Sequence, residues 1–192
     1  MRDTERCILA PYREVRGQIA NGDLLLFRRR GLIALAGRGV HSHAAKAARW
    51  EEDLFCLEIR EWFGGRAVTL SSQVERFPGR IDVYEVNPRR RWRDYDRAGA
   101  VRFMRRLTGG DYGWRNLVSA ALLHLPGIRL WARCDTDDRH LSRRPPFCSQ
   151  AVAMAERLGG GIDPVPHLAD RFTEPADLAR SPFYQYRFTL TV

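Results

Sequence analysis

Short apolar segments, separated by polar turns and glycines, dominate the first half of the chain and predict a series of strands. The first segment, residues 23–27, is almost continuously apolar after its leading aspartate, which is typical of a buried strand. Charged or glycine-containing turns, Glu51-Glu52-Asp53 and Gly64-Gly65, separate later segments. The predicted strands cover residues 23–27, 43–50, 54–62, 66–70, 80–86 and 183–190. Because the connections among the first five are short, we expect an antiparallel meander.

Helical spacing of apolar residues takes over in the second half. Asp96 can cap a helix over 97–107, whose apolar residues lie on one face and which Gly109 follows. The predicted helices cover residues 11–20, 70–77, 97–107, 115–125 and 147–158. Residues 126–146, with prolines and a polar run, are expected to form a loop over a site. The pattern predicts one α+β domain over residues 1–192.

Charge and hydropathy indicate where in the cell this domain is expected and which kinds of partner it can attract. No apolar run approaches the roughly 18 residues of a membrane span, and the N-terminus lacks the features of a signal peptide. We therefore expect a cytoplasmic protein, released if at all by lysis or phage delivery. The net charge is +9, almost all from arginine, since Lys46 is the only lysine. This charge indicates either attraction to a polyanion or simply a solvated surface.

Cys148 is the cysteine whose position indicates chemistry. It follows Pro145-Pro146 at the start of a predicted helix, where the helix dipole and unpaired N–H groups favour a thiolate and can stabilise an oxyanion. The alternative is a buried structural cysteine. The four cysteines show no CxxC spacing, and the chain has no metal-ligand spacing or glycine-rich phosphate loop. No metal or other cofactor is therefore expected.

A histidine and a glutamate on neighbouring predicted strands are the candidate partners of this cysteine. His43 opens the alanine-rich strand, and an imidazole near the thiol can act as its base. His41 would share its face if that strand extended back, and the pattern does not choose between them. In the next strand the alternation separates Phe55, Leu57 and Ile59 from Cys56, Glu58 and Arg60. Glu58 can orient the imidazole, or it can be a surface residue paired with Arg60 or Lys46.

Four motifs, in this order, resemble the permuted papain-like cysteine amidases of the YiiX-like branch of the NlpC-type cell-wall peptidase superfamily. The first three are Gly22-Asp23-Leu24-Leu25-Leu26-Phe27, Ser42-His43-Ala44-Ala45 and Leu57-Glu58-Ile59. The last is Phe147-Cys148-Ser149-Gln150-Ala151-Val152, which carries the family's nucleophile. Residues 173–178 resemble the family's tail motif. Lys46, where the family has an apolar residue, and Ile59, where it has a small one, depart from the pattern.

The resemblance implies a papain-like antiparallel sheet packed on helices, with the nucleophile Cys148 at a helix N-terminus. It implies His43 as base, Glu58 as third triad member, and Tyr112 and Ser149 as substrate-binding residues. The expected activity is a cysteine peptidase or amidase acting through an acyl-enzyme, on peptidoglycan peptides or a related amide. One alternative is a lipid or N-acyl hydrolase or acyltransferase. A second is a basic nucleic-acid-binding or phage structural protein, which no recognised nucleic-acid motif favours.

Overall fold

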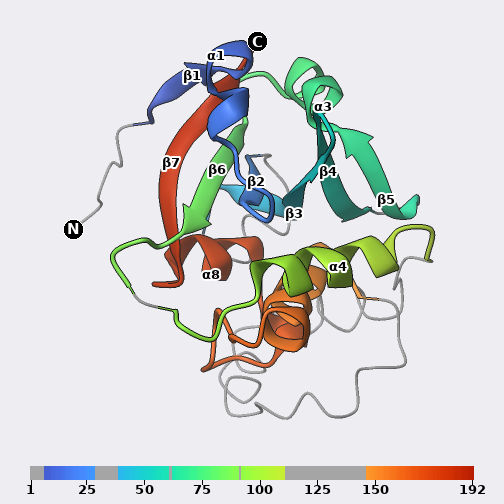
Figure 1. Cartoon of the computed structure of the whole chain (residues 1–192), viewed down its shortest axis with the longest axis vertical. Helices are drawn as coiled ribbons and strands as arrows, with labels where there is room; N and C mark the ends of the chain where they lie inside the picture. The colour runs from blue at the N-terminus through green and yellow to red at the C-terminus, as the bar shows by residue number, and fades with distance from the viewer. Residues whose placement is uncertain (1–6, 29–38, 61, 91, 111–145) are drawn as a thin grey trace.

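The structure is a computed structural model that describes residues 7–28, 39–60, 62–90, 92–110 and 146–192 (Figure 1). Its elements in chain order are β1 (Leu9–Pro11), α1 (Tyr12–Val15), η1 (Arg16–Gln18), β2 (Leu24–Arg28), β3 (His41–Trp50), β4 (Asp53–Arg60), β5 (Gly64–Thr69), α3 (Leu70–Arg76), β6 (Ile81–Val86), α4 (Arg97–Leu107), α7 (Cys148–Met154), η2 (Ala155–Gly159), η3 (Asp170–Phe172), α8 (Pro175–Arg180) and β7 (Tyr184–Thr191). The predicted helix 115–125 and nearly all of the predicted loop 126–146 lie outside the described residues.

The strands form one seven-stranded sheet in the order β1-β7-β6-β2-β3-β4-β5. The prediction of a purely antiparallel sheet is wrong at one edge, because β1 pairs with β7 in parallel. The predicted meander holds only from β2 to β5, since β6 returns to pair with β2 on its other side. Helix α3, between β5 and β6, carries the chain back across the sheet. The result is an α+β architecture with a mixed sheet.

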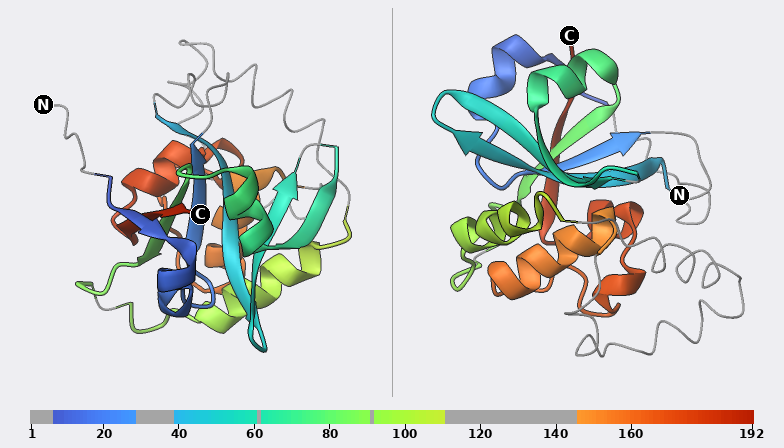
Figure 2. Two further views of the ribbon diagram at one scale, coloured as in Figure 1. Left: turned by 90° about the horizontal axis from the view of Figure 1, so that it is seen from above. Right: turned by 90° about the vertical axis from the view of Figure 1, so that its right-hand side faces the viewer.

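Helices cover both faces of the sheet and define two apolar clusters. Figures 1 and 2 show α4, α7 and α8 against one face and α1 and α3 against the other. One core cluster combines Leu24, Leu26, Ala44 and Ala48 with residues of α4, α7 and α8, and the other gathers side chains such as Leu25, Ala45 and Ala47 with Val15 of α1. Neighbouring residues of β2 and β3 thus point to opposite faces, as strand geometry requires. None of the helices described is long and apolar enough to cross a membrane.

Helix α4 has the predicted bounds, and the predicted cap is present. The side chain of Asp96 accepts a hydrogen bond of 2.8 Å from the Gly99 N–H, which satisfies one of the free donors of the first turn. A Cβ on Gly99 would lie 2.1 Å from the Gly159 carbonyl oxygen. Glycine at this position is what lets α4 and η2 pack backbone to backbone.

The helix that carries Cys148 differs from the prediction at both ends. It begins at Cys148, with Phe147 as its N-cap, and its last turn, η2, is a π-helix over Ala155–Gly159. A π-turn inserts one extra residue per hydrogen-bonded ring and is frequent at functional sites. The turn places Glu156, a fully buried carboxylate, in the interface between helix and sheet.

Strand bounds agree with the prediction to within a few residues. β3 begins at His41 rather than His43, and its register with β2 shifts between Phe27 and Arg28. Gly64 and Gly65, which were predicted to form the turn, belong to β5. The turn between β4 and β5 is closed by a hydrogen bond from the Phe63 N–H to the Arg60 carbonyl, and it includes Trp62 with φ 71°. A non-glycine residue in the left-handed region is uncommon, whereas glycine adopts it readily. The sequence therefore predicts the turn at Gly64-Gly65 rather than at Trp62.

Candidate active site

The first turn of α7 places Cys148 against the beginning of β3. Helix α7 packs on β3, and Cys148, only 6% exposed, interacts through its side chain with the backbone N–H groups of Ala44 and Ser149. Because α7 continues directly into η2, the sulfur lies at the positive end of a longer helical segment. The structure therefore gives this thiol the environment that the sequence predicted for it.

His43 joins Cys148 to Glu58. The imidazole and the thiol share a side-chain hydrogen bond, and His43 Nε2 lies 2.6 Å from Glu58 Oε2. An ionised carboxylate can only accept, so Nε2 carries the proton and Nδ1 is the nitrogen left for the sulfur. The ring of Phe27 packs edge-on against the imidazole at 5.1 Å between centroids. The three residues proposed as a triad from the sequence are thus brought together.

Glu58 is buried, which excludes its interpretation as a surface residue. Its side chain is fully inaccessible, and Oε1 accepts hydrogen bonds of 2.8 Å and 2.5 Å from Nε and Nη2 of Arg66. Arg60 Nη1 lies farther away, at 3.6 Å. Arg66 is not among the residues predicted from the sequence, and it lies directly across the β4–β5 ladder from Glu58. Arg66 occupies the second oxygen of the carboxylate with hydrogen bonds and thereby fixes the orientation of the Glu58 side chain.

Opposite charges set the protonation states of the three residues. Burial alone would lower the pKa of His43, but the Cys148 sulfur and Glu58 outweigh burial and raise this pKa to about 9. Burial would raise the pKa of Cys148, yet His43 and the N–H groups of Ala44 and Ser149 lower it below the usual thiol value. Burial would likewise raise the pKa of Glu58, but His43 and Arg66 lower it to about 2. The favoured state is a thiolate beside an imidazolium.

His41, the other histidine that the sequence left as a candidate, has a different partner from His43. Its Nε2 lies 2.7 Å from Asp82 Oδ2 on β6, and its ring packs edge-on against Tyr84. His41 belongs to a separate polar cluster, whereas His43 is the histidine bonded to Cys148.

The two residues predicted to bind substrate have different outcomes. Ser149 is fully buried, and its hydroxyl donates a hydrogen bond of 2.7 Å to the Thr173 carbonyl, so the hydroxyl serves the packing of α7 against the segment before α8. A substrate contact of Ser149 stays a prediction. Tyr112 lies outside the described residues, and its role also stays a prediction.

A second charged network, on the other face of β3, holds the same helix at its far end. The Lys46 ammonium binds Glu156 Oε1, and both side chains are fully buried. Tyr184 donates a hydrogen bond of 2.5 Å to Oε1, and Tyr95 donates one of 2.6 Å to Oε2. Lys46, the departure from the family pattern, is therefore the partner of a helix residue rather than of Glu58. We call these four residues the Glu156 network.

Comparison with known proteins places the fold. No family model matches the chain, and no curated protein matches it. Among solved structures, the crystal structure of the metalloprotein YiiX from Escherichia coli O157:H7 matches with a TM-score of 0.59 and 13% identity, over 91% of this chain and 99% of that one. The fold is YiiX-like. The predicted resemblance to YiiX is thereby confirmed for the architecture, and the activity has to be argued from the site.

YiiX is described as a metalloprotein, which raises the possibility of a metal site in this chain. Within the described ranges, no group of three or more His, Cys, Asp or Glu side chains is placed to hold a metal ion. Both oxygens of Glu58 already accept hydrogen bonds, from His43 and Arg66. The described residues do not fit a metal site, and the mechanism proposed below uses none.

Proposed function

We propose that this protein is a cysteine hydrolase that cleaves amide bonds through an acyl-enzyme on Cys148. The observation that carries the proposal is the chain of hydrogen bonds from Cys148 through His43 to Glu58, at the N-terminus of a helix. A nucleophile, a base and a group that orients the base are the recurring parts of covalent acyl transfer. The YiiX-like fold agrees with this function and does not by itself carry an activity.

The arrangement supports the following steps. The Cys148 thiolate attacks the carbonyl carbon and forms a C–S bond, while N–H groups at the start of α7 stabilise the negative oxygen. His43 gives its proton to the leaving nitrogen as the C–N bond breaks. His43 then takes a proton from a water molecule, whose oxygen attacks the thioester and releases the acid. Glu58, held by Arg66, keeps the proton on Nε2 throughout.

The substrate class that we propose is a peptide or acyl amide, with peptidoglycan peptides first. The net charge of +9 suits an anionic wall polymer. Release by lysis or phage delivery, and organisation as one domain over residues 1–192, stay predictions.

Alkylation and turnover test the proposal together. Cys7 is exposed whereas Cys148 is buried, so accessibility alone makes Cys7 the faster thiol towards iodoacetamide. We expect the opposite order below pH 8, read by peptide mass spectrometry, because His43 and the start of α7 lower the pKa of Cys148. Purified protein should release amines from muropeptides or N-acyl dipeptides, Cys148→Ala should release none, and the matched thiol control Cys7→Ala should be unaffected. Turnover that survives in Cys148→Ala would refute the proposal.

A further inference from the structure

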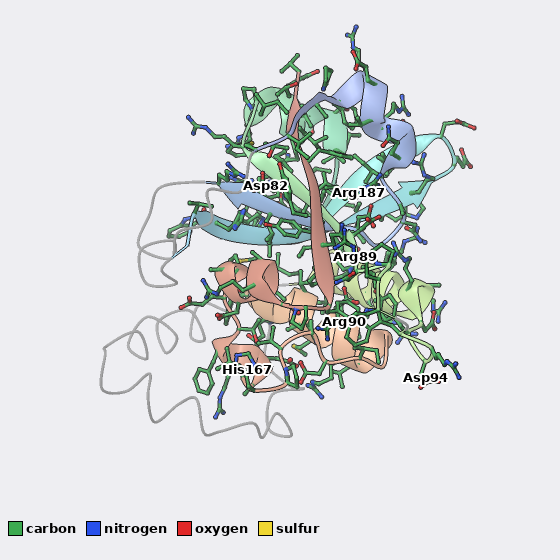
Figure 3. The ribbon with its side chains drawn as sticks, turned by 90° about the vertical axis from the view of Figure 1, so that its left-hand side faces the viewer. Asp82, Arg89, Arg90, Asp94, His167 and Arg187 are labelled. Carbon is green, nitrogen blue, oxygen red and sulfur yellow. The ribbon has the colours of Figure 1, made fainter. Side chains whose placement is uncertain are left out.

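The connection between β6 and α4 carries the densest run of positive charge in the sequence. Four of the five residues in Arg89-Arg90-Arg91-Trp92-Arg93 are arginines. The side chains of Arg89, Arg90 and Arg93 are exposed, and Arg91 lies outside the described residues. Figure 3 views the side of the molecule that carries this connection, with Arg89 and Arg90 labelled on it. We call Arg89, Arg90 and Arg93 the arginine cluster.

The cluster differs from most arginines of the structure because its charges have no partner. Within the described part of the chain, no ion pair or side-chain hydrogen bond joins Arg89, Arg90 or Arg93 to another residue. Asp94 follows in the sequence but forms no ion pair with them, and Figure 3 shows it well apart from Arg89 and Arg90. Arg187, labelled on the same side, donates a hydrogen bond of 2.7 Å to a backbone carbonyl. Because like charges repel one another, the described chain leaves three neighbouring cations uncompensated.

The backbone of this connection is held in place by hydrogen bonds and buried rings. The Asn87 N–H donates a hydrogen bond of 2.8 Å to the Phe183 carbonyl, and Asn87 Oδ1 accepts one of 3.0 Å from the Arg89 N–H. The rings of Trp92 and Tyr95 pack edge-on against Phe183, at 5.0 Å and 5.1 Å between centroids. The cations are therefore presented from a fixed backbone, which reduces the entropy lost on binding.

The connection reaches the end of the nucleophile helix that is opposite to Cys148. The Asp96 N–H donates a hydrogen bond of 3.0 Å to the carbonyl of Gly160, the residue that follows η2. Because α7 and η2 contain 7 and 5 residues, a rise of about 1.5 Å per residue separates this contact from Cys148 by roughly 18 Å. The cluster is therefore anchored far from the sulfur, so it can hold a long polymer chain rather than the reacting amide.

The exposed groups favour a polyanion without bases. Each guanidinium is a planar fork that matches the paired oxygens of a phosphodiester. The aromatic rings of the segment face inward, since Trp92 packs on Phe183 and the Tyr95 hydroxyl donates to Glu156. Among the described residues of this segment, no exposed ring is thus left to stack on a base, as single-strand binders require. The arginines also lie on a loop and not on a helix or ribbon that could enter the major groove of a duplex.

We propose that the arginine cluster is a docking surface for a phosphodiester polymer of the cell wall, separate from the Cys148 site. The choice of a wall polymer rests on the proposed function, because a wall amidase meets such polymers where its substrate lies. The surface holds the enzyme on the wall while peptides reach Cys148 at the other end of the helix.

The test measures binding of poly(glycerol phosphate), a phosphodiester chain without bases, by fluorescence anisotropy. The cluster variant combines Arg89→Gln, Arg90→Gln and Arg93→Gln. We expect its Kd at low salt to rise on the order of a hundredfold, about fivefold for each charge lost near a polyanion. The slope of log Kd against log salt should fall by about 2, because each cation on a single chain contributes about 0.7.

A matched control removes the same charge from scattered positions. It combines Arg13→Gln, Arg80→Gln and Arg106→Gln, which change three exposed arginines on α1, before β6 and on α4. None of these three has an ion pair among the residues that the structure describes. We expect this control to bind the polymer far more tightly than the cluster variant. Urea unfolding of both variants should give the midpoint of the wild type, because all six positions are exposed.

Each outcome bears on a separate statement. Equal losses of binding in the two variants, or no binding by the wild type, would overturn the docking surface and leave the proposed function standing. Single-stranded DNA with the same number of phosphates is the comparison, and tighter binding of DNA that depends on the cluster would overturn the choice of a wall polymer. Turnover of a small N-acyl amide is measured separately on the wild type. Its absence, with cluster-dependent binding of the polymer, would contradict the proposed function and leave the docking surface standing.

Discussion

The two charged networks on strand β3 use similar groups and differ in what they leave open. On one face, Glu58 holds His43 and Arg66; on the other, Glu156 holds Lys46 and two tyrosines. Both side chains of the Lys46–Glu156 pair are fully buried, whereas the His43 side chain is 17% exposed and keeps one ring nitrogen for Cys148. A network whose groups are all buried and bonded to one another can only hold parts of the fold together. A network with a ring nitrogen facing a thiol can also transfer a proton. The same strand thus carries the proposed catalytic histidine near its start and, three residues later, the lysine that attaches the helix to the sheet.

The largest expected effect is a loss of turnover, and it should occur in the network of His43 and Glu58 and not in that of Lys46 and Glu156. His43→Ala removes the base and the proton donor, so turnover should fall about a thousandfold, within the range for general acid–base catalysis. The free energy of unfolding should fall less than in Lys46→Met, because Arg66 still compensates the buried Glu58 carboxylate. Steady-state kinetics and urea unfolding measure the two quantities. Full activity in His43→Ala would show that another residue acts as the base. His41→Ala is the matched control.

Lys46→Met should show the reverse pattern. It leaves the Glu156 carboxylate buried without its cation, which costs about 3–5 kcal/mol of unfolding free energy. The double variant Lys46→Met with Glu156→Gln should recover most of this loss, since no charge then remains buried. Urea midpoints at constant m-value provide the measurement. A Lys46→Met protein as stable as the wild type would show that the pair contributes nothing to the fold.

Glu58→Gln tests the orienting carboxylate. The amide can keep a contact with His43 but no longer compensates the imidazolium, so we expect turnover to fall about a hundredfold. The pKa of His43, now about 9, should move down, and NMR titration of its ring protons would report it. An unchanged pKa together with unchanged turnover would remove Glu58 from the triad.

The pH dependence follows from the shifted pKa values. The pKa of Cys148 is lowered and that of His43 is raised to about 9, so the thiolate–imidazolium pair prevails between the two. We expect kcat/KM to fall by about tenfold per pH unit above pH 9, as His43 in the free enzyme loses the proton that it gives to the leaving group. Alkylation of Cys148, which needs only the thiolate, should not fall there. Parallel losses of both rates would indicate unfolding instead.

Tyr95→Phe should have the smallest effect. It removes one hydrogen bond to Glu156 Oε2 and leaves Lys46 and Tyr184 in place, so the expected cost is about 1 kcal/mol. Calorimetry would detect the corresponding shift in Tm. A loss as large as that of Lys46→Met would show that the network stabilises the fold as one unit rather than pair by pair.

Local signals explain which features the sequence could predict. Helix α4 is predictable to the residue because Asp96 and Gly109 mark its two ends, and Cys148 is recognisable because it begins a helix. The parallel pairing of β1 is not predictable, because Leu9–Pro11 is too short to show an alternation. The Lys46–Glu156 pair joins residues 110 positions apart, and no local pattern contains such a contact. The importance of Arg66 depends on the burial of Glu58, which the alternation alone does not show.

Contacts near both ends of the helix that begins at Cys148 and closes in the π-turn Ala155–Gly159 constrain the number of residues between them. Each residue of an α-helix advances the side chains by about 100°, so deletion of one residue between Cys148 and Glu156 would swing the carboxylate away from Lys46 while the sulfur stayed beside His43. Evolution of this chain can therefore exchange side chains along the segment far more easily than it can add or remove one. Insertions and deletions among relatives that keep both contacts should be confined to positions before Cys148 or after Gly159.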